Sequence, residues 1–327
     1  MRTPLCDLLG IDAPVVLAPM GGAVTPALAA AVSNAGGLGM LPLTWTSPDE
    51  VAAVVDETRQ QTERPFGVNL GLAWDQHERL AAVLAAGARI VSFFWGDASD
   101  IIGEARDAGA IVFVTVGTAE EGRAAAASGA DVVVAQGWEA GGHVWGTVST
   151  LALVPRVVDA VAPVPVVAAG GIADGRGLAA VLALGAVGAW VGTRFLAASE
   201  AAIHPDYRRR ILAAGEADTF FGTLFDRGWP DAPHRALRNS TVEAWEQAGR
   251  PVSGSRPGED DEPASRLDGS PINRYTSTTP TAEMAGDVEP LPHWAGQGVG
   301  LVTREESAAV IVDSLVREAE EAIESLT

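Results

Sequence analysis

Lysine is absent from this sequence, and all 22 of its basic residues are arginines. Without a lysine the chain cannot form a Schiff base, so it is neither a lysine-dependent aldolase nor an enzyme that uses pyridoxal phosphate. A nucleotide-binding P-loop, which needs its own lysine, is excluded for the same reason. The absence therefore removes covalent amine chemistry from the functions that the chain can perform.

Cysteine is nearly absent as well, since Cys6 is the only one. A single thiol can build neither an internal disulfide framework nor a cysteine-rich zinc or iron–sulfur site. The histidines lack the spacing of metal ligands, so no metal site is expected. This sparing use of cysteine suits the reducing cytoplasm, which is the predicted location.

Long apolar segments are also missing. The first residues of the chain lack the hydrophobic stretch of a signal peptide. The uncharged run Gly177–Gly192 is shorter than the roughly 20 residues of a membrane-spanning helix, and it contains glycines. The formal charge of −20 repels phosphate backbones and anionic lipids, so neither nucleic acid nor a membrane is expected as a partner. A homodimer stays open as an alternative to a monomer.

Eight short apolar segments recur through the first two-thirds of the chain. Their nearly continuous hydrophobicity is typical of parallel strands that are buried on both faces. The segments are Pro14–Met20, Leu38–Pro42, Phe66–Leu70, Arg89–Trp95, Ala110–Val116, Asp131–Gly137, Val164–Gly171 and Gly188–Phe195.

Alanine-rich helical stretches separate these segments. Thr25 and Pro26 begin the first stretch with an N-cap residue and a proline at the first helical position. Glycines such as Gly109 and Gly129 end several of the stretches. Eight alternations of strand and helix predict an α/β fold of the (β/α)8 type, a TIM barrel, with an open doubly wound sheet as the alternative.

The alternation stops after the eighth segment. Residues 199–300 are rich in proline, glycine, arginine and aspartate, which predicts a small inserted substrate or lid domain. Helices are expected at Pro205–Ala214 and Thr241–Gln247, and a mobile acidic loop at Val252–Pro271.

The end of the chain is amphipathic. The apolar positions within Glu305–Leu326 suit a helix with one buried face, which is expected to be the eighth helix of the barrel. The barrel would then comprise residues 1–198 and 301–327.

Glycines follow the last two predicted strands. Gly170 and Gly171 end the seventh, and Gly192 and Thr193 end the eighth. Barrel enzymes often bind phosphate at these two ends, where backbone N–H groups hold the anion without any lysine. The alternative is a tight turn that merely needs small residues. The two consecutive glycine-containing ends favour a phosphate site.

His143 follows the glycine pair Gly141-Gly142 after the sixth predicted strand. The two glycines would let the loop approach a flat ligand, and imidazole can act as a base or as a hydrogen-bond donor near neutral pH. Asn69 and Gln136 also lie at strand ends. Their amides can donate and accept hydrogen bonds, which suits either the edge of a flavin ring or the capping of loops.

Other polar and aromatic residues near strand ends have structural interpretations. Asp174 stands where a helix N-cap belongs, and Glu139 is expected to be structural. Trp45, Trp95, Trp138 and Trp145 either wall an apolar pocket or pack at the rim of the barrel.

Several motifs occur together in this chain. They are APMGGAVTPALAAAVSNAGGLG, FGVNL, AQGWEAGGH, AAGGIADGRG, VGTRF and WAGQGVGLV. Together they resemble the nitronate monooxygenases, formerly called 2-nitropropane dioxygenases. The resemblance runs from Ala18 to Phe195 and resumes at Trp294–Val302. It implies an FMN-dependent barrel that oxidises alkyl nitronates with O2 to a carbonyl compound and nitrite.

The resemblance also implies roles for particular residues. His143 would be the active-site histidine, as base or as hydrogen-bond donor, and Gln297 would lie near the pocket. The residues implied or expected at the cofactor are Ala18, Pro19, Met20, Asn69, Gln136, Gly141, Gly142, Gly170, Gly171, Trp190, Val191, Gly192 and Thr193.

Two features depart from the family pattern. Val144 and Trp145 follow the histidine, and an acidic stretch surrounds Glu259–Glu262. Related flavin enoyl-acyl-carrier-protein reductases usually have Glu where this chain has Gln136, which favours the oxygenase. An NAD(P)H-dependent reductase, a non-flavin phosphate-binding isomerase and a non-catalytic flavin carrier stay open as alternatives.

Overall fold

Eight parallel strands form a single sheet in the computed structural model, which describes residues 1–326. Thr327, the last residue of the predicted barrel segment 301–327, lies outside the described residues. A parallel bridge between Val16 and Leu38 brings the two edges of the sheet together into a barrel. In sheet order, the strands are β1 (Val15–Leu17), β9 (Gly188–Val191), β8 (Val166–Ala169), β6 (Val132–Gln136), β5 (Ile111–Val116), β4 (Ile90–Phe94), β3 (Phe66–Gly71) and β2 (Gly39–Pro42).

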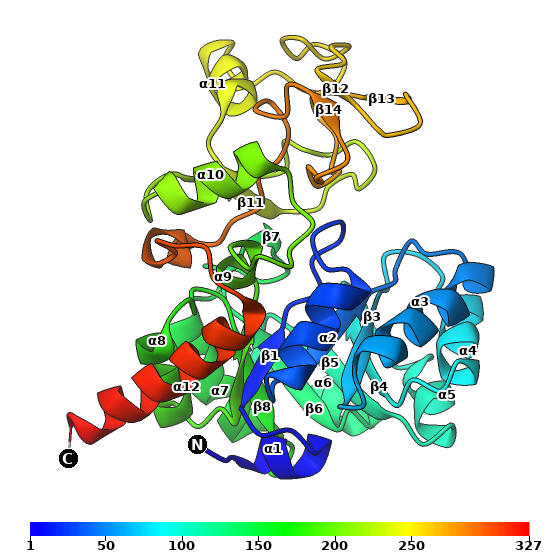
Figure 1. Ribbon diagram of the computed structural model, residues 1–327, viewed down its shortest axis with the longest axis vertical. Helices are drawn as coiled ribbons and strands as arrows, with labels where there is room; N and C mark the ends of the chain where they lie inside the picture. The colour runs from blue at the N-terminus through cyan, green and yellow to red at the C-terminus, as the bar shows by residue number, and fades with distance from the viewer. Residues whose placement is uncertain (327) are drawn as a thin grey trace.

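Helices surround the barrel (Figure 1). They are α2 (Pro26–Asn34), α3 (Pro48–Gln61), α4 (His77–Ala85), α5 (Ile102–Asp107), α6 (Ala119–Ser128), α7 (Thr150–Val161), α8 (Gly175–Ala183) and α12 (Ala308–Glu324). The last of these packs against α8 and α2, so it completes the ring as predicted. The remaining barrel helix, α1 (Pro4–Leu9), packs under the amino ends of the strands, where Thr3 donates a hydrogen bond to the Val187 carbonyl.

The helix starts follow from local sequence. Thr25 caps α2 by accepting a hydrogen bond from the Leu28 amide, and Asp174 caps α8 by accepting one from the Gly177 amide. The predicted N-caps at Thr25 and Asp174 are therefore confirmed, whereas Ser47, at the start of α3, makes no capping hydrogen bond with its side chain. Each cap satisfies an amide that lacks a partner within the helix.

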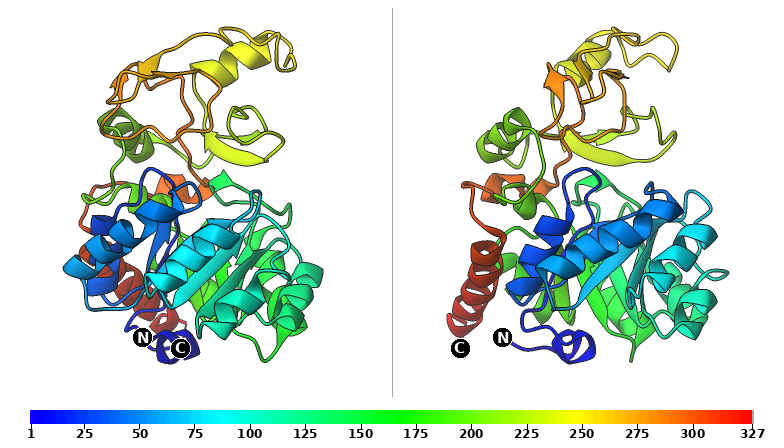
Figure 2. Two further views of the ribbon diagram at one scale, coloured as in Figure 1. Left: turned by 90° about the vertical axis from the view of Figure 1, so that its right-hand side faces the viewer. Right: turned by 45° about the vertical axis from the view of Figure 1, so that its right-hand side comes forward.

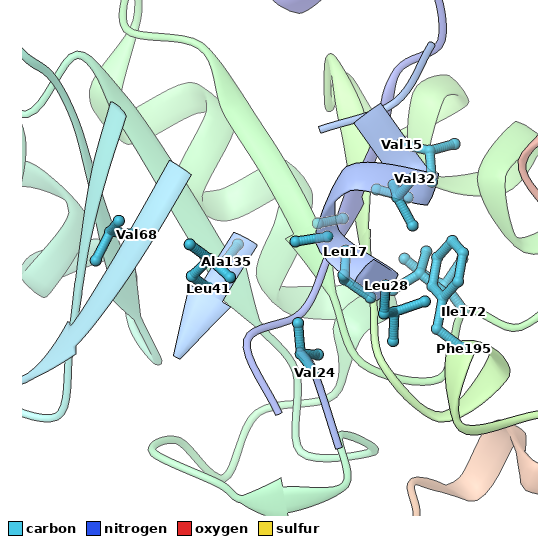
Figure 3. Packing of buried hydrophobic residues seen from close by; sticks show 14 of the residues in the cluster. Val15, Leu17, Val24, Leu28, Val32, Leu41, Val68, Ala135, Ile172 and Phe195 are labelled. Carbon is cyan, nitrogen blue, oxygen red and sulfur yellow. The ribbon is translucent and has the colours of Figure 1, made fainter. Parts of the chain in front are cut away.

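The hydrophobic core has two layers because strand side chains alternate between the two faces of the sheet. Val15 and Leu17 point outward and pack against Leu28 and Val32 of α2 (Figure 3). Val16 belongs instead to the inner cluster with Met40, Phe113, Val134, Val167 and Trp190. The filled interior supports the barrel and leaves its carboxyl end for a site.

The segment between the eighth strand and the last helix covers one end of the barrel (Figure 2). Its elements are α9 (Thr193–Leu196), α10 (Pro205–Ala213), β10 (Thr219–Gly222), β11 (His234–Leu237), α11 (Ser240–Gln247), β12 (Ala264–Ser265), β13 (Pro271–Ile272), β14 (Ala285–Gly286) and the 3-10 helix η1 (Gln297–Leu301). Both predicted helices of this segment are present.

Three sequence expectations need correction. The eighth strand ends at Val191 rather than Phe195, because the chain turns at Gly192 and the Phe195 amide donates to the Gly192 carbonyl. The expected loop Val252–Pro271 contains β12 and the start of β13, which pair in antiparallel register. The third correction concerns the segment that carries His143.

Gly142 and His143 form a short strand, β7, in the segment that was expected to be a loop after the sixth strand. This strand leaves the barrel sheet and pairs with β11 of the insertion. A two-residue strand carries no periodicity, and its partner lies about ninety positions further along the chain.

Candidate active site

A cavity of about 1210 Å³ lies between the carboxyl ends of the barrel strands and the insertion. Most of the predicted site residues line it: Ala18, Pro19, Met20, Asn69, Gln136, Gly141, Gly142, His143, Gly170, Gly171, Trp190, Gly192 and Thr193. Val191 and Gln297 do not. Val191 is buried in β9 among core residues. The backbone amide of Gln297 donates to the Glu139 carbonyl, and the neighbouring Gly296 and Gly298 line the cavity instead.

Gln136 fixes the segment that carries His143. Its side-chain nitrogen donates to the His143 carbonyl at 3.2 Å, and its side-chain oxygen accepts from the Trp145 amide at 2.8 Å. Both ends of this amide are thus engaged by the protein. The residue therefore braces β7 from the barrel side while it also lines the cavity.

The glycine before His143 has no side chain to fill the space beside it. Gly142 has a φ of +68°, and an added Cβ would meet no atom within 4 Å. Gly141 is packed differently, because a Cβ there would lie 2.3 Å from the Gly296 nitrogen. Gly141 therefore permits close packing against the backbone at Gly296, and Gly142 leaves open space in the cavity wall.

The His143 ring is enclosed by aromatic side chains. The Trp229 ring lies 4.0 Å away with a tilt of 30°, and Trp95, Trp294 and His234 lie between 5.5 and 5.9 Å. The Nε2 atom of His143 is buried and makes no hydrogen bond with any described residue. Burial, with a smaller contribution from His234, lowers the pKa of His143 to about 3, so its ring is neutral at pH 7.

The glycine-rich strand ends meet on one side of the cavity. Gly170 and Gly171 have φ values of +103° and +73°, which favour glycine. Gly192 packs near Ala18, where an added Cβ would approach the Ala18 Cβ to 3.3 Å. The Thr193 hydroxyl accepts a hydrogen bond from the Gly296 amide. Backbone at both ends can therefore approach a ligand closely.

Asn69 contributes from β3. Its side-chain nitrogen donates to the Ser92 hydroxyl at 3.1 Å and to the Ser92 carbonyl at 3.3 Å. These bonds hold the amide at the cavity wall, with its oxygen left to accept from a ligand.

The two acidic residues that the sequence marked as structural have structural partners. Glu139 accepts hydrogen bonds from the backbone and the hydroxyl of Thr150, at 2.9 and 3.0 Å. Asp174 caps α8. No group of three or more metal-ligating side chains is found among residues 1–326. In the same part of the chain, no helix has both the length and the apolarity to cross a membrane.

Sequence reasoning missed the contribution of the insertion. Trp229 lines the cavity, and its ring lies against His143 at a tilt of 30°. His234 is buried on β11, and its ring centroid lies 5.9 Å from that of His143. The only sign in the sequence that this segment contributes to the site was the high number of tryptophans. That number does not tell which residues, far apart in the chain, contact one another.

The glycine-rich strand ends and the enclosed His143 ring form a ligand-binding site at the carboxyl end of a (β/α)8 barrel, and comparison with known proteins gives its family. A family model described as nitronate monooxygenase matches residues 2–78 and 71–318. The chain belongs to the nitronate monooxygenase family and is an oxidoreductase enzyme.

Relatives within this similarity differ in their named activities. A nitronate monooxygenase of Paraburkholderia phytofirmans is 34% identical, over 99% of this chain and 97% of that protein. A (3aS,4S,5R,7aS)-5-hydroxy-7a-methyl-1-oxo-octahydro-1H-indene-4-carboxyl-CoA dehydrogenase of Mycobacterium tuberculosis is 42% identical over 253 residues, which cover 76% of this chain and 70% of that protein.

Solved structures give the same range. FabK from Thermotoga maritima superposes with a TM-score of 0.86 and 34% identity, covering 100% of this chain and 98% of that chain. A nitroalkane oxidase from Streptomyces ansochromogenes superposes with a TM-score of 0.79 and 31% identity, covering 99% of each chain. These similarities support the barrel fold and the enzyme family. They do not identify the substrate, which has to be inferred from the residues of the site.

Proposed function

We propose that this protein binds FMN and oxidises alkyl nitronates with O2 to a carbonyl compound and nitrite. The observation that carries the proposal is the buried Nε2 of His143, which makes no hydrogen bond with any described residue and belongs to a ring on the cavity wall. A buried polar atom without a partner is costly, so such an atom at a cavity is a reason to expect a ligand that supplies the partner.

The cavity residues fit a flavin mononucleotide. Gly170 and Gly171, which have positive φ values, and Gly192, which packs beside Ala18, would admit its phosphate end, since none of the three carries a side chain. Ala18–Met20 and Asn69 would face the ring. When bound, the flavin supplies the electron transfer that no side chain of this chain can perform.

The protein's own contribution is to hold and orient the substrate. Because its pKa is lowered to about 3, His143 is neutral at physiological pH and can accept a proton at Nε2 or donate from it, according to its tautomer. As a donor it would hydrogen-bond to an oxygen of the nitronate; as a base it would act one step earlier, taking the proton from the carbon of a neutral nitroalkane to form the nitronate. We propose that residues 199–300 serve as the lid that keeps this step away from water, with the enzyme acting in the cytoplasm.

An absorbance scan and a variant pair test this function. The purified protein should show a flavin absorbance band, either as isolated or after it binds added FMN. In the absence of O2, propionate 3-nitronate should bleach this band. His143→Ala should keep the flavin and lose turnover, whereas His77→Ala, at an exposed helix position, should retain both. Normal turnover in His143→Ala would refute the assigned role.

A second candidate is a flavin oxidoreductase acting on a larger thioester substrate. The cavity of about 1210 Å³ exceeds the roughly 300–1,000 Å³ of common ligand sites. The 42% identical relative carries a carboxyl-CoA substrate in its name. Bleaching by NAD(P)H or by an acyl-CoA, with no response to nitronates, would favour this candidate over the first.

A further inference from the structure

One tryptophan of the insertion covers the histidine on which the proposed function depends. Trp229 is 6% exposed, and its ring lies 4.0 Å from the His143 ring at a tilt of 30°. The Nε2 atom of His143 is inaccessible in this arrangement. A substrate atom must come within hydrogen-bond distance of Nε2 to react there, so the arrangement has to change before His143 can act.

The backbone around Trp229 is held at both ends. On one side, the Arg227 amide donates to the Tyr275 carbonyl, and the Arg227 carbonyl accepts from the Ser277 amide at 2.8 Å. On the other side, the Pro233 carbonyl accepts from the Val144 amide of the barrel. These bonds fix the two ends of a short segment, residues 228–232, which carries the indole. Within the segment, the Trp229 amide donates to the Asp226 carbonyl at 3.1 Å.

Two residues inside that segment have unusual backbone angles. Gly228 has a φ of +102°, and Asp231 has a φ of +55° although it is not glycine. A non-glycine residue at positive φ is uncommon, and residues that tolerate large backbone changes are suited to hinges. The two positions bracket Trp229 and Pro230, so a rotation at both would move the indole while the ends stay fixed.

The indole sits among other tryptophans that belong to the barrel. Trp74 and Trp95 approach it at 4.7 and 5.0 Å, and Trp45 approaches at 5.9 Å, all in edge-on geometry. Trp45 and Trp74 are 57% and 36% exposed, which is high for such large apolar side chains. A departing Trp229 would therefore leave a space bounded by three indoles and His143.

We propose that Trp229 is a gate over His143 and that the space it vacates is the subsite for the apolar part of the substrate. In the closed state the indole itself occupies this subsite. An apolar chain or ring next to the reacting carbon replaces the indole against Trp45, Trp74 and Trp95, and this exchange uncovers Nε2. The proposal rests on the proposed role of His143, and it adds a preference for bulky apolar substrates.

Chemical access to His143 can be measured without any turnover. Diethyl pyrocarbonate modifies accessible neutral imidazoles, and mass spectrometry of peptides gives a separate rate for each histidine. His77 is 46% exposed and serves as an internal reference. If the open state is a minor one, the rate at His143 should be at least about tenfold lower than at His77, in proportion to the open fraction.

Trp229→Ala should raise the rate at His143 by about tenfold or more, and Trp229→Phe, which keeps a smaller ring, should raise it less. The matched control is Trp245→Ala. It removes an indole from α11 of the same insertion, where Trp245 packs on Phe220 away from the cavity. This control should leave the rate unchanged. Equal rates at His143 in the wild-type protein and both Trp229 variants would overturn the gate.

Substrate preference tests the subsite. Trp229→Ala should raise kcat/KM for nitronates with long apolar chains relative to short ones, chiefly through KM, because the substrate no longer has to displace the indole. An unchanged ratio would overturn the subsite. If the wild-type protein oxidises no nitronate at all, the proposed function fails, while the modification rates still decide whether Trp229 covers His143.

Discussion

His143 of β7 lies directly opposite His234 of β11 in an antiparallel pair. The segment that carries the proposed active-site histidine is therefore a strand of the insertion's sheet rather than of the barrel. The next pair joins Gly142 to Arg235. Any movement of β11 acts on the His143 backbone, so the insertion positions the histidine as well as covering it.

Gln136 braces the same segment from the barrel, and changing it to Glu tests that brace. The carboxylate keeps an acceptor for the Trp145 amide but loses the donor to the His143 carbonyl. Placing an acceptor against that carbonyl should cost about 1–3 kcal/mol. We expect Gln136→Glu to lower kcat roughly tenfold with little change in flavin content, measured by steady-state kinetics and absorbance.

Gln61→Glu, the same change at an exposed position of α3, is the control and should behave as wild type. A Gln136→Glu enzyme with normal kcat would mean that the brace does not position His143.

Two glycines with nearly equal φ separate backbone strain from ligand contact. Gly171 lines the cavity at φ +73°, and Gly109 ends α5 at φ +75° with no atom within 4 Å of an added Cβ. Alanine at either position should lower the free energy of unfolding by about 1 kcal/mol, since both adopt a left-handed conformation. Only Gly171→Ala should also weaken FMN binding, measured by fluorescence titration.

Equal FMN affinity in the two variants would remove Gly171 from the proposed phosphate end. A loss of affinity in Gly109→Ala as well would point to global strain as the cause.

The sequence predicted the barrel and most of its cavity wall because those features are local. A few adjacent residues are enough to recognise a short apolar strand, a cap such as Asp174 or a glycine pair such as Gly170-Gly171. The enclosure of His143 could not be predicted, because it depends on packing between β7 and residues about ninety positions away. Trp229 and His234 lie in segments without periodicity, so no pattern placed them at the site.

Arg235 is a buried cation on β11. Replacing it should show whether its charge or its packing on Trp138 stabilises the fold. It is 2% exposed, its guanidinium lies 4.3 Å from the Trp138 ring, and it donates to the Trp138 carbonyl at 2.9 Å. No carboxylate forms an ion pair with it among the described residues. Arg235→Lys and Arg235→Met should both lower the free energy of unfolding, measured by urea denaturation. The loss in Arg235→Lys should exceed the loss in Arg235→Met by about 1–2 kcal/mol.

The reason is that a lysine ammonium would stay charged in an apolar site without the planar stacking of arginine, whereas methionine fills the space and removes the charge. A more stable lysine variant would show that the charge itself, rather than the stack on Trp138, holds β11 in place.

The buried His234 and His293 and the enclosed ring of His143 make stability depend on pH. Burial lowers the pKa of His143 and of His293 to about 3 and that of His234 to about 4. In the unfolded chain an imidazole titrates near pH 6.5. Between these values the unfolded state binds more protons, so the free energy of unfolding should fall as the pH falls from about 6.5 towards 3.

His293 offers the cleanest test of this dependence, because it lies outside the cavity wall. It is fully buried and stacks on Tyr207 at 4.7 Å. His293→Phe keeps the ring and removes the titration. The variant should therefore lose less stability than the wild type between pH 7 and pH 5, measured as the urea midpoint at each pH.

His77→Phe is the control of opposite sign. The hydrogen bond that the His77 ring donates to Glu104 raises the pKa of His77, so its contribution to stability is present below pH 6.5 and is lost as the pH rises through its folded-state value. Removing His77 should leave the loss of stability on acidification as large as in the wild type or larger. If His293→Phe and the wild type lose stability equally between pH 7 and pH 5, then the proton uptake that drives acid unfolding lies at other residues, and burial of His293 has no part in it.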